Sequence, residues 1–230
     1  MPRILLRVCF RFLLCGIGIG LFSVHPASAQ APTDMKVLEE HRTANGDIVR
    51  TIQYTQGGRR VTETRTIKQF QPLTQPIDPD TLNRDSLLVV VSKSRFVLDV
   101  YYKRKKIRSY KVVFGPKPKE NKMMKGDRCT PEGKFSVLNK HASARYDKFI
   151  QIDYPNDSSR VRFELLKKKG AIPANAEIGG DVGIHGIWKG GDEMIDMGVG
   201  WTDGCIAMKN KDIEELYRIL DVGVKVFIRK

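Results

Sequence analysis

The sequence predicts a mainly β domain of the sandwich or barrel type with one or two short helices. Runs rich in β-branched and aromatic residues recur from residue 86 to the end of the chain, and short turn segments separate them. Helical periodicity is clear in one place only. The 230 residues, 41% of them hydrophobic, are enough to bury a core without disulfide bonds.

The elements follow from these patterns in chain order. Strands are expected at 87–91, 95–102, 107–114, 135–138, 149–152, 161–163 and 224–228. Lys103-Arg104-Lys105-Lys106 is interpreted as a solvated hairpin turn and not as a nucleic-acid site, because no aromatic residue is interleaved. Ile213, Leu216, Tyr217 and Leu220 mark one face of a helix that begins after Asn210, a natural N-cap. A shorter helix is expected at 164–169, ended by Gly170.

The first 29 residues have the pattern of a secretory signal peptide. Arg3, Arg7 and Arg11 precede or interrupt an apolar stretch at 10–24, and Ala27-Ser28-Ala29 is a small-x-small cleavage site. An uncleaved membrane anchor is the alternative, although the stretch is short for a span. We therefore expect an exported, periplasmic protein.

Three further segments follow the leader. Residues 30–70 are expected to form a small β-hairpin appendage that turns at Gly57-Gly58. Residues 71–85 contain three prolines and read as a linker. The remainder, 86–230, is the expected mainly β domain.

The basic charge is confined to one part of the chain. The net charge is +14 overall, and it is +11 without the leader. Residues 86–170 alone carry +14, whereas residues 171–230 carry −3. An exported protein of this kind is expected to meet anionic cell-wall or membrane material and no nucleic acid. Lys117, Lys119, Lys122 and Lys125 form either a solvated loop or a surface that holds such a polymer.

Removing the leader leaves two cysteines, Cys129 and Cys205. They could form one disulfide, or one thiol could stay free for chemistry. Asp181, His185 and Cys205 could suggest a metal site, but no further histidine lies nearby, so no metal or other cofactor is expected.

Cys205 and His185 are the residues best suited to nucleophilic acyl transfer. Each has a glycine beside it, Gly204 before the cysteine and Gly186 after the histidine. A nearby imidazole can activate a thiol, and glycines let backbone N–H groups approach the sulfur and hold an oxyanion. Taken alone, a histidine and a cysteine at this spacing also fit a structural pair.

These residues resemble the signature of the L,D-transpeptidase catalytic domain, the YkuD family. His185-Gly186 and Thr202-Asp203-Gly204-Cys205, with Asn210 five positions beyond the cysteine, match its nucleophile motif. Gly126-Asp127, followed by Thr130-Pro131-Glu132-Gly133, is similar to its second motif. The resemblance covers about 86–229. It differs at Ala207, where many members have arginine, and Gly-Cys-Ile-Ala resembles a Gram-negative-type subgroup whose activities are less uniform.

The resemblance implies an L,D-transpeptidase-like β-sandwich or barrel and a role for each residue. Cys205 would attack a peptidoglycan stem peptide, and His185 would take the thiol proton. Gly204 and Gly186 would support the oxyanion, and Asn210 would be structural. The positions assigned to substrate binding are Thr202, Asp203, Trp188 and Trp201. The two tryptophans are either core anchors or the walls of a cleft covered by a mobile lid, 187–201.

Three functions remain open from the sequence. The first is transfer to an amine of another stem or of a wall-attached lipoprotein. The second is hydrolysis at the same site, as in an L,D-carboxypeptidase or a wall-protein-releasing enzyme. The third is an inactive wall-binding module.

Overall fold

The computed structural model describes residues 33–44, 47–67 and 77–230. The expected signal peptide, 1–29, and residues 71–76 of the expected linker lie outside the described residues. The end of that linker contains two 3-10 turns, Pro79–Thr81 and Arg84–Ser86.

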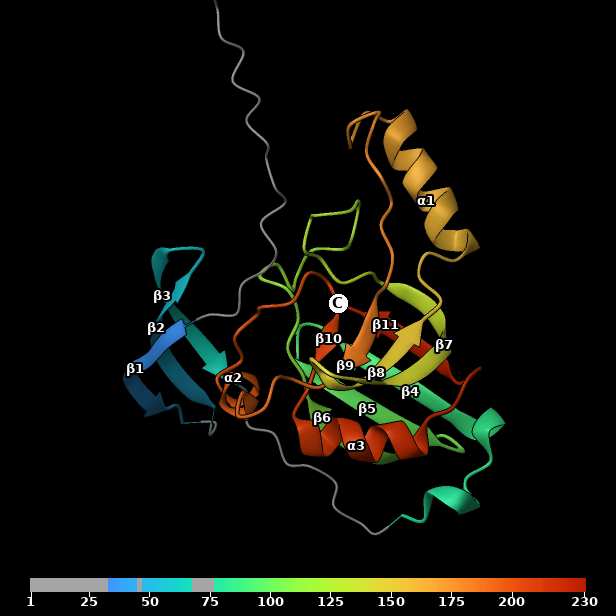
Figure 1. Cartoon of the computed structure of the whole chain (residues 1–230), viewed down its shortest axis with the longest axis horizontal. Coiled ribbons are helices and arrows are strands. Elements are labelled where there is room, and N and C mark those ends of the chain that lie inside the picture. The colour runs from blue at the N-terminus through green and yellow to red at the C-terminus, as the bar shows by residue number, and fades with distance from the viewer. Residues whose placement is uncertain (1–32, 45–46, 68–76) are drawn as a thin grey trace, which may run out of the picture.

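Eight strands form the main sheet (Figure 1). Their bounds are β4 Leu87–Ser92, β5 Val97–Tyr102, β6 Lys105–Lys111, β7 Gly133–Ser143, β8 Asp147–Ile152, β9 Gly183–His185, β10 Ile206–Ala207 and β11 Lys225–Arg229. The order across the sheet is β10-β9-β8-β7-β11-β4-β5-β6. The sheet curls so that its two edges approach, and one isolated bridge, Val113 to Ala207, joins the segment after β6 to β10 at the opposite edge. A single bridge does not close the sheet into a barrel. The predicted mainly β fold is confirmed.

Three α-helices accompany the sheet: α1 Asp157–Lys168, α2 Asp192–Asp196 and α3 Asn210–Ile219. α3 lies against the sheet, while α1 stands away from it (Figure 1). The apolar face predicted for α3 is confirmed, because Ile213 and Leu216 are fully buried in the main core. That core fixes the strands that carry the candidate site.

Two expectations for 161–169 were wrong. Residues 161–163 belong to α1 and not to a strand, and the helix expected from 164 begins at Asp157. The Asn156 side chain accepts a hydrogen bond from the Ser159 N–H at 3.1 Å and so starts the helix earlier. Only Phe163 of α1 is buried, so the alternation of apolar residues there reflected no sheet face.

The amino-terminal region forms a second, antiparallel sheet of three strands, β1 Thr33–Arg42, β2 Ile48–Gln56 and β3 Arg59–Ile67. β2 and β3 are the predicted hairpin, and both glycines of its turn, Gly57 and Gly58, have positive φ. β1 was not expected, because nearly all its side chains are exposed. It is held by its pairing with β2 and by Met35, which packs against the apolar cluster that includes Ile52 and Tyr54.

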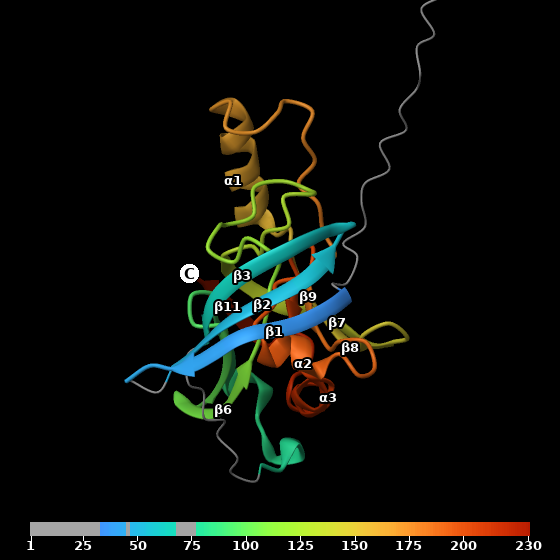
Figure 2. The same cartoon turned by 90° about the vertical axis from the view of Figure 1, so that its left-hand side faces the viewer.

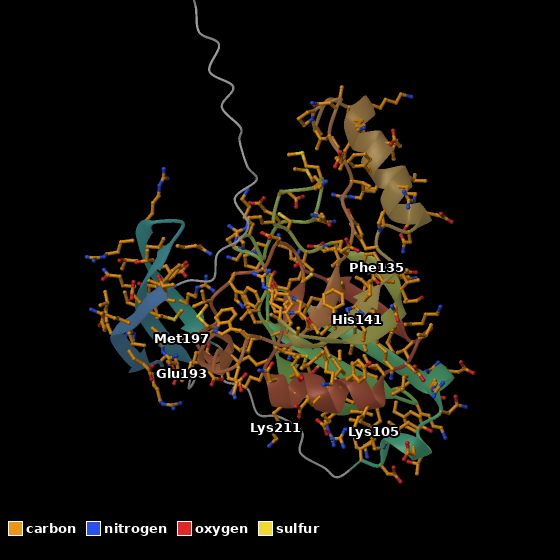
Figure 3. All side chains as sticks on the ribbon, viewed as in Figure 1. Lys105, Phe135, His141, Glu193, Met197 and Lys211 are labelled. Atoms are coloured by element: carbon orange, nitrogen blue, oxygen red, sulfur yellow. The ribbon has the colours of Figure 1, made fainter. Side chains whose placement is uncertain are left out.

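This small sheet packs against the part of the chain that carries the main sheet (Figure 2). Ile52 and Tyr54 of β2 are 1% and 5% exposed. Their buried partners in one apolar cluster are Val113, Ile187, Met194, Ile195, Val199, Trp201 and Ala207. Met197, labelled beside Glu193 in Figure 3, lies on the same side and packs against this cluster. The sheet is thus seated on segment 187–201, the expected lid.

No helix among the described residues combines the length and apolar character that a membrane span requires.

Candidate active site

The parallel pairing of β9 with β10 places the two candidate residues, Cys205 and His185, on neighbouring segments. In this register Ile206 lies opposite Ile184 and Ala207 opposite His185. Cys205 directly precedes β10, so it lies beside the first residue of β9, Gly183. Because side chains two apart on a strand share a face, Cys205 and His185 lie on the same face of adjacent strands.

His185 is held as a neutral imidazole. Its side chain is buried, and its Nδ1 lies 2.6 Å from the Gly186 carbonyl oxygen. A carbonyl can only accept, so Nδ1 carries the proton and Nε2 keeps its lone pair, as a general base requires. Burial lowers the pKa of His185 to about 4, against the Gly186 hydrogen bond, which raises it.

Aromatic side chains enclose the imidazole. Tyr146 stacks on it with ring centroids 4.4 Å apart, and Phe149 is nearly parallel to it at 5.7 Å. Trp201 meets the ring edge-on at 5.6 Å. These contacts fix the ring orientation and keep water from the imidazole.

Cys205 is partly exposed and carries a neutral thiol. The S–H donates to the Asp181 carbonyl oxygen at 3.5 Å. Burial raises the pKa of the Cys205 thiol to about 11, although a Gly183 N–H directed at the sulfur lowers it. With His185 also neutral, the resting pair is thiol and imidazole, so the proton moves only as the sulfur attacks.

Thr202 shapes the nucleophile loop, residues 202–205, which leads into β10. Its hydroxyl donates to the Cys205 carbonyl oxygen at 2.7 Å and accepts from the Gly204 N–H at 3.3 Å. Gly204 has a φ of +126°, and an added Cβ would lie 2.6 Å from the Cys129 carbonyl oxygen. The glycine before the nucleophile is therefore required by space and by backbone conformation.

Gly186 and Asn210 join the histidine strand to α3. A Cβ at Gly186 would lie 2.4 Å from the Asn210 Oδ1. That same oxygen accepts from the Ile187 N–H at 2.8 Å. Asn210 is the first residue of α3 and not its N-cap, and its own N–H donates to the Asp192 Oδ1 at 3.1 Å. Its side chain ties the helix to the segment after His185.

The oxyanion role of Gly204 and Gly186 stays a prediction. The Gly204 N–H donates within its loop, and the Gly186 N–H donates to the Tyr146 carbonyl oxygen at 3.1 Å. Each of these N–H groups thus already has an acceptor inside the protein.

Asp203 lies at the exposed rim of the site. Its Oδ1 accepts from the Arg128 Nε at 3.0 Å, and the Arg128 Nη2 donates to the Trp201 carbonyl oxygen at 3.3 Å. Arg128 thereby links the Gly126-Asp127 motif to the nucleophile loop. The substrate-binding assignment of Asp203, like that of Thr202, stays a prediction.

Trp188 and Trp201 pack against each other. Their rings meet edge-on at 5.0 Å, and Trp201 is 3% exposed. Segment 187–201 that joins them contains α2 and is packed against the small sheet. This packing supports the interpretation of both residues as anchors, and their contact with substrate stays a prediction.

Cys129 and Cys205 are both free thiols. Cys129 is buried, and burial raises the pKa of its thiol. Among the described residues, no three histidine, cysteine or acidic side chains gather as metal ligands would.

Sequence reasoning missed Tyr146 and Arg128. Tyr146 lies in the turn between β7 and β8, far from either motif, and it reaches His185 only through the pairing of β8 with β9. Arg128 stood inside the second motif, but its contact with Asp203 depends on how two distant loops meet. No local pattern marks either residue.

Residues 86–228 match the family model of the L,D-transpeptidase catalytic domain, YkuD. None of the curated proteins matches the chain.

Several solved structures are similar to parts of the chain. An L,D-transpeptidase from Xylanimonas cellulosilytica is 15% identical over 63% of this chain and 60% of its own, with a TM-score of 0.42. An L,D-transpeptidase mutant from Enterococcus faecium is 19% identical over 63% of this chain and 50% of its own, with a TM-score of 0.40. L,D-transpeptidase 3 from Mycobacterium tuberculosis is 13% identical over 86% of this chain and 82% of its own, with a TM-score of 0.42. This chain therefore spans less than two thirds of the first two.

The family model covers more than half of the sequence, and the matched range includes both motifs, Cys205 and His185. The chain belongs to the L,D-transpeptidase catalytic domain family.

Proposed function

We propose that this protein is an exported cysteine acyltransferase that acts on peptidoglycan stem peptides. The observation that carries the proposal is the position of Cys205 beside His185 on adjacent parallel strands, with the imidazole held in the tautomer of a general base. Membership of the L,D-transpeptidase catalytic domain family supports the substrate class. The apolar stretch and the small-x-small site within residues 1–29 support export.

The reaction has two steps. Cys205 attacks the carbonyl at the L-centre of the diamino acid in a tetrapeptide stem while its proton passes to the His185 Nε2. The tetrahedral intermediate collapses to a thioester as the C–N bond breaks, and the terminal D-Ala leaves with the proton from His185. An acceptor amine then attacks the thioester, and His185 takes a proton from that amine. The C–S bond breaks as the new C–N bond forms, and the proton passes from His185 to the leaving Cys205 sulfur, which restores the thiol and the neutral imidazole.

The acceptor decides the biological product. An amine of another stem gives a cross-link, and an amine of a wall-attached lipoprotein gives protein attachment. Water gives a tripeptide, and the enzyme is then an L,D-carboxypeptidase.

Incubation of the purified protein with tetrapeptide muropeptides tests this proposal. We expect cross-linked dimers and released D-Ala, measured by liquid chromatography with mass spectrometry, and neither product with Cys205→Ala. Cys129→Ala is the matched control, because it removes the other free thiol. Formation of tripeptide without dimer would show that the enzyme hydrolyses the stem and does not transfer it. Equal activity in Cys205→Ala would refute the cysteine mechanism.

A further inference from the structure

Lys122 differs from the other lysines of its loop. Its side chain is buried, whereas those of Lys117 and Lys125 are exposed. Lys117 pairs with Glu120, and Lys125 pairs with Glu177 at 2.7 Å. These pairs favour a solvated loop over a polymer-holding surface. They do not explain a buried ammonium, which is rare without a specific partner.

The Lys122 ammonium is fixed on two sides. Its Nζ donates to the Asp127 Oδ1 at 2.9 Å and to the Met124 carbonyl oxygen at 3.1 Å. The Lys122 carbonyl oxygen accepts from the Arg162 Nη1 of α1 at 2.6 Å. An ammonium has three N–H donors, so one remains beyond these two bonds.

The ammonium faces the residue that precedes the nucleophile. Lys122 Nζ lies 3.9 Å from the position that a Gly204 Cβ would occupy. Its Cε lies 3.7 Å from the corresponding position at Gly179, in the loop before β9. Because both residues are glycines, the lysine side chain fits between the two loops that carry them. A side chain at position 204 would point toward the ammonium.

The reaction places negative charge in surroundings that oppose it. Asp203 and Asp181 are acidic neighbours of Cys205, and both raise the pKa of its thiol. The positive charge of Lys122 lowers the pKa of the Cys205 thiol. Of the other charged groups nearby, Arg128 pairs with Asp203, and Arg145 lies over the Tyr146 ring at 5.0 Å. His185 is neutral and adds no positive charge before the proton transfer.

We propose that Lys122 is an electrostatic positioning residue of the reaction, whose buried ammonium stabilises the negative charge that forms at Cys205 and on the attacked carbonyl. This rests on the proposed acyl transfer. As the S–C bond forms, the C=O π pair moves to oxygen, and the thiol proton goes to His185. Lys122 keeps its proton throughout and acts only through its charge and its remaining N–H.

Alkylation of Cys205 by iodoacetamide tests the inference, with the site resolved by peptide mass spectrometry so that Cys129 does not interfere. For Lys122→Gln we expect the second-order rate constant at pH 8 to fall by about threefold or more, because loss of a neighbouring cation raises the thiol pKa by about a unit or more while the stronger nucleophile partly compensates. Lys122→Arg keeps the charge and should restore most of the rate. Lys125→Gln, in the same loop, should leave it unchanged.

Two outcomes would overturn the inference. One is a Lys122→Gln rate within about 1.5-fold of the wild type. The other is equal loss in Lys122→Gln and Lys122→Arg, which indicates a packing role. Should Lys122→Gln not fold, Lys122→Gln with Asp127→Asn removes both charges of the pair, and its Cys205 rate must still lie below that of Asp127→Asn alone.

Alkylation needs no peptide, so this test is separate from that of the proposed function. With tetrapeptide donor, Lys122→Gln should lower kcat and leave KM near the wild-type value, because the charge acts on the transition state. Inactivity of the wild type on tetrapeptide would refute the proposed function and leave the alkylation result standing.

Discussion

Cys205 and His185 form a neutral pair at the residue scale. The Cys205 thiol has a raised pKa of about 11, and His185 has a lowered pKa of about 4. Burial is the main cause of both shifts, since it disfavours the charged form of each group. The pair therefore differs from a preformed thiolate and imidazolium, and charge separates only during attack.

This neutrality predicts the pH dependence of Cys205 alkylation. Because the thiol pKa lies near 11, the rate constant should rise about tenfold per pH unit from pH 7 to pH 9 without levelling off. Site-resolved iodoacetamide labelling measures it. A plateau below pH 8 would mean a thiolate stabilised in the resting enzyme and would contradict the account.

His185 also makes the stability of the fold depend on pH. Its pKa is about 4 in the folded chain and near 6.5 when unfolded. Between these values the unfolded chain binds a proton that the folded chain does not, so the stabilisation is complete above pH 6.5 and is lost as the pH falls toward 4. The full difference is about 3 kcal/mol.

Urea denaturation of the wild type and His185→Gln at pH 7.5, 6, 5 and 4.5 measures this loss. The wild type should lose stability toward acid faster than the variant. Half-buried Asp212, whose pKa desolvation raises to about 6, titrates in the same window with the opposite sign, but it is present in both proteins and cancels in the difference. Parallel pH profiles would show that His185 is not buried as a neutral ring.

At the element scale, the small sheet and segment 187–201 stabilise each other. The segment has one short helix, and its buried side chains share a cluster with Ile52 and Tyr54 of β2. The Tyr54 hydroxyl also bonds to the Glu63 Oε1 at 3.0 Å, which fixes its ring within the sheet. Residues 33–67 thus brace the segment that connects the histidine strand to the nucleophile loop.

Ile52→Ala should destabilise the protein by about 2–4 kcal/mol, because it leaves a cavity at a side chain that is 1% exposed. Limited proteolysis should then cut within 187–201 faster than in the wild type. Leu38→Ala on β1 is the matched control, since Leu38 is 53% exposed and its loss should change stability by less than about 0.5 kcal/mol. Unchanged proteolysis in a destabilised Ile52→Ala protein would show that the sheet does not brace the segment.

The elements that could be predicted are those whose side chains carry a pattern. The long β-branched runs gave β4 to β8 and β11, and the apolar face of α3 was clear. β9 and β10 are too short to show a period, although they carry the site. β1 has almost only exposed side chains, and α1 was obscured by the alternation of Val161-Arg162-Phe163.

The same distinction holds for the site. Cys205, His185 and their glycines are local motifs and could be found in the sequence. Tyr146, Arg128 and the buried state of Lys122 depend on which loops the fold brings together, and one sequence holds no signal for such contacts. The expectation that Asn210 is the N-cap of α3 was wrong for a related reason. Its side-chain oxygen accepts from the Ile187 N–H, in a segment distant in sequence, and does not cap the helix.

At the scale of the whole molecule, the basic residues of 86–170 lie in two different environments. The basic excess of 86–170 includes exposed lysines that pair with nearby carboxylates and one lysine buried beside the nucleophile loop. The pairing of β9 with β10 places that loop beside the histidine strand, and the small sheet packs against segment 187–201, which precedes the loop. The molecule therefore presents a partly exposed thiol above a buried base, as acyl transfer from a polymeric substrate requires.

Intact-protein mass spectrometry during turnover of a tetrapeptide stem can detect the thioester on Cys205. We expect a transient adduct on Cys205 whose mass equals that of the donor less the terminal D-Ala, and no adduct in Cys205→Ala. Release of D-Ala without any adduct on the wild type, or an adduct that persists in Cys205→Ala, would contradict this expectation.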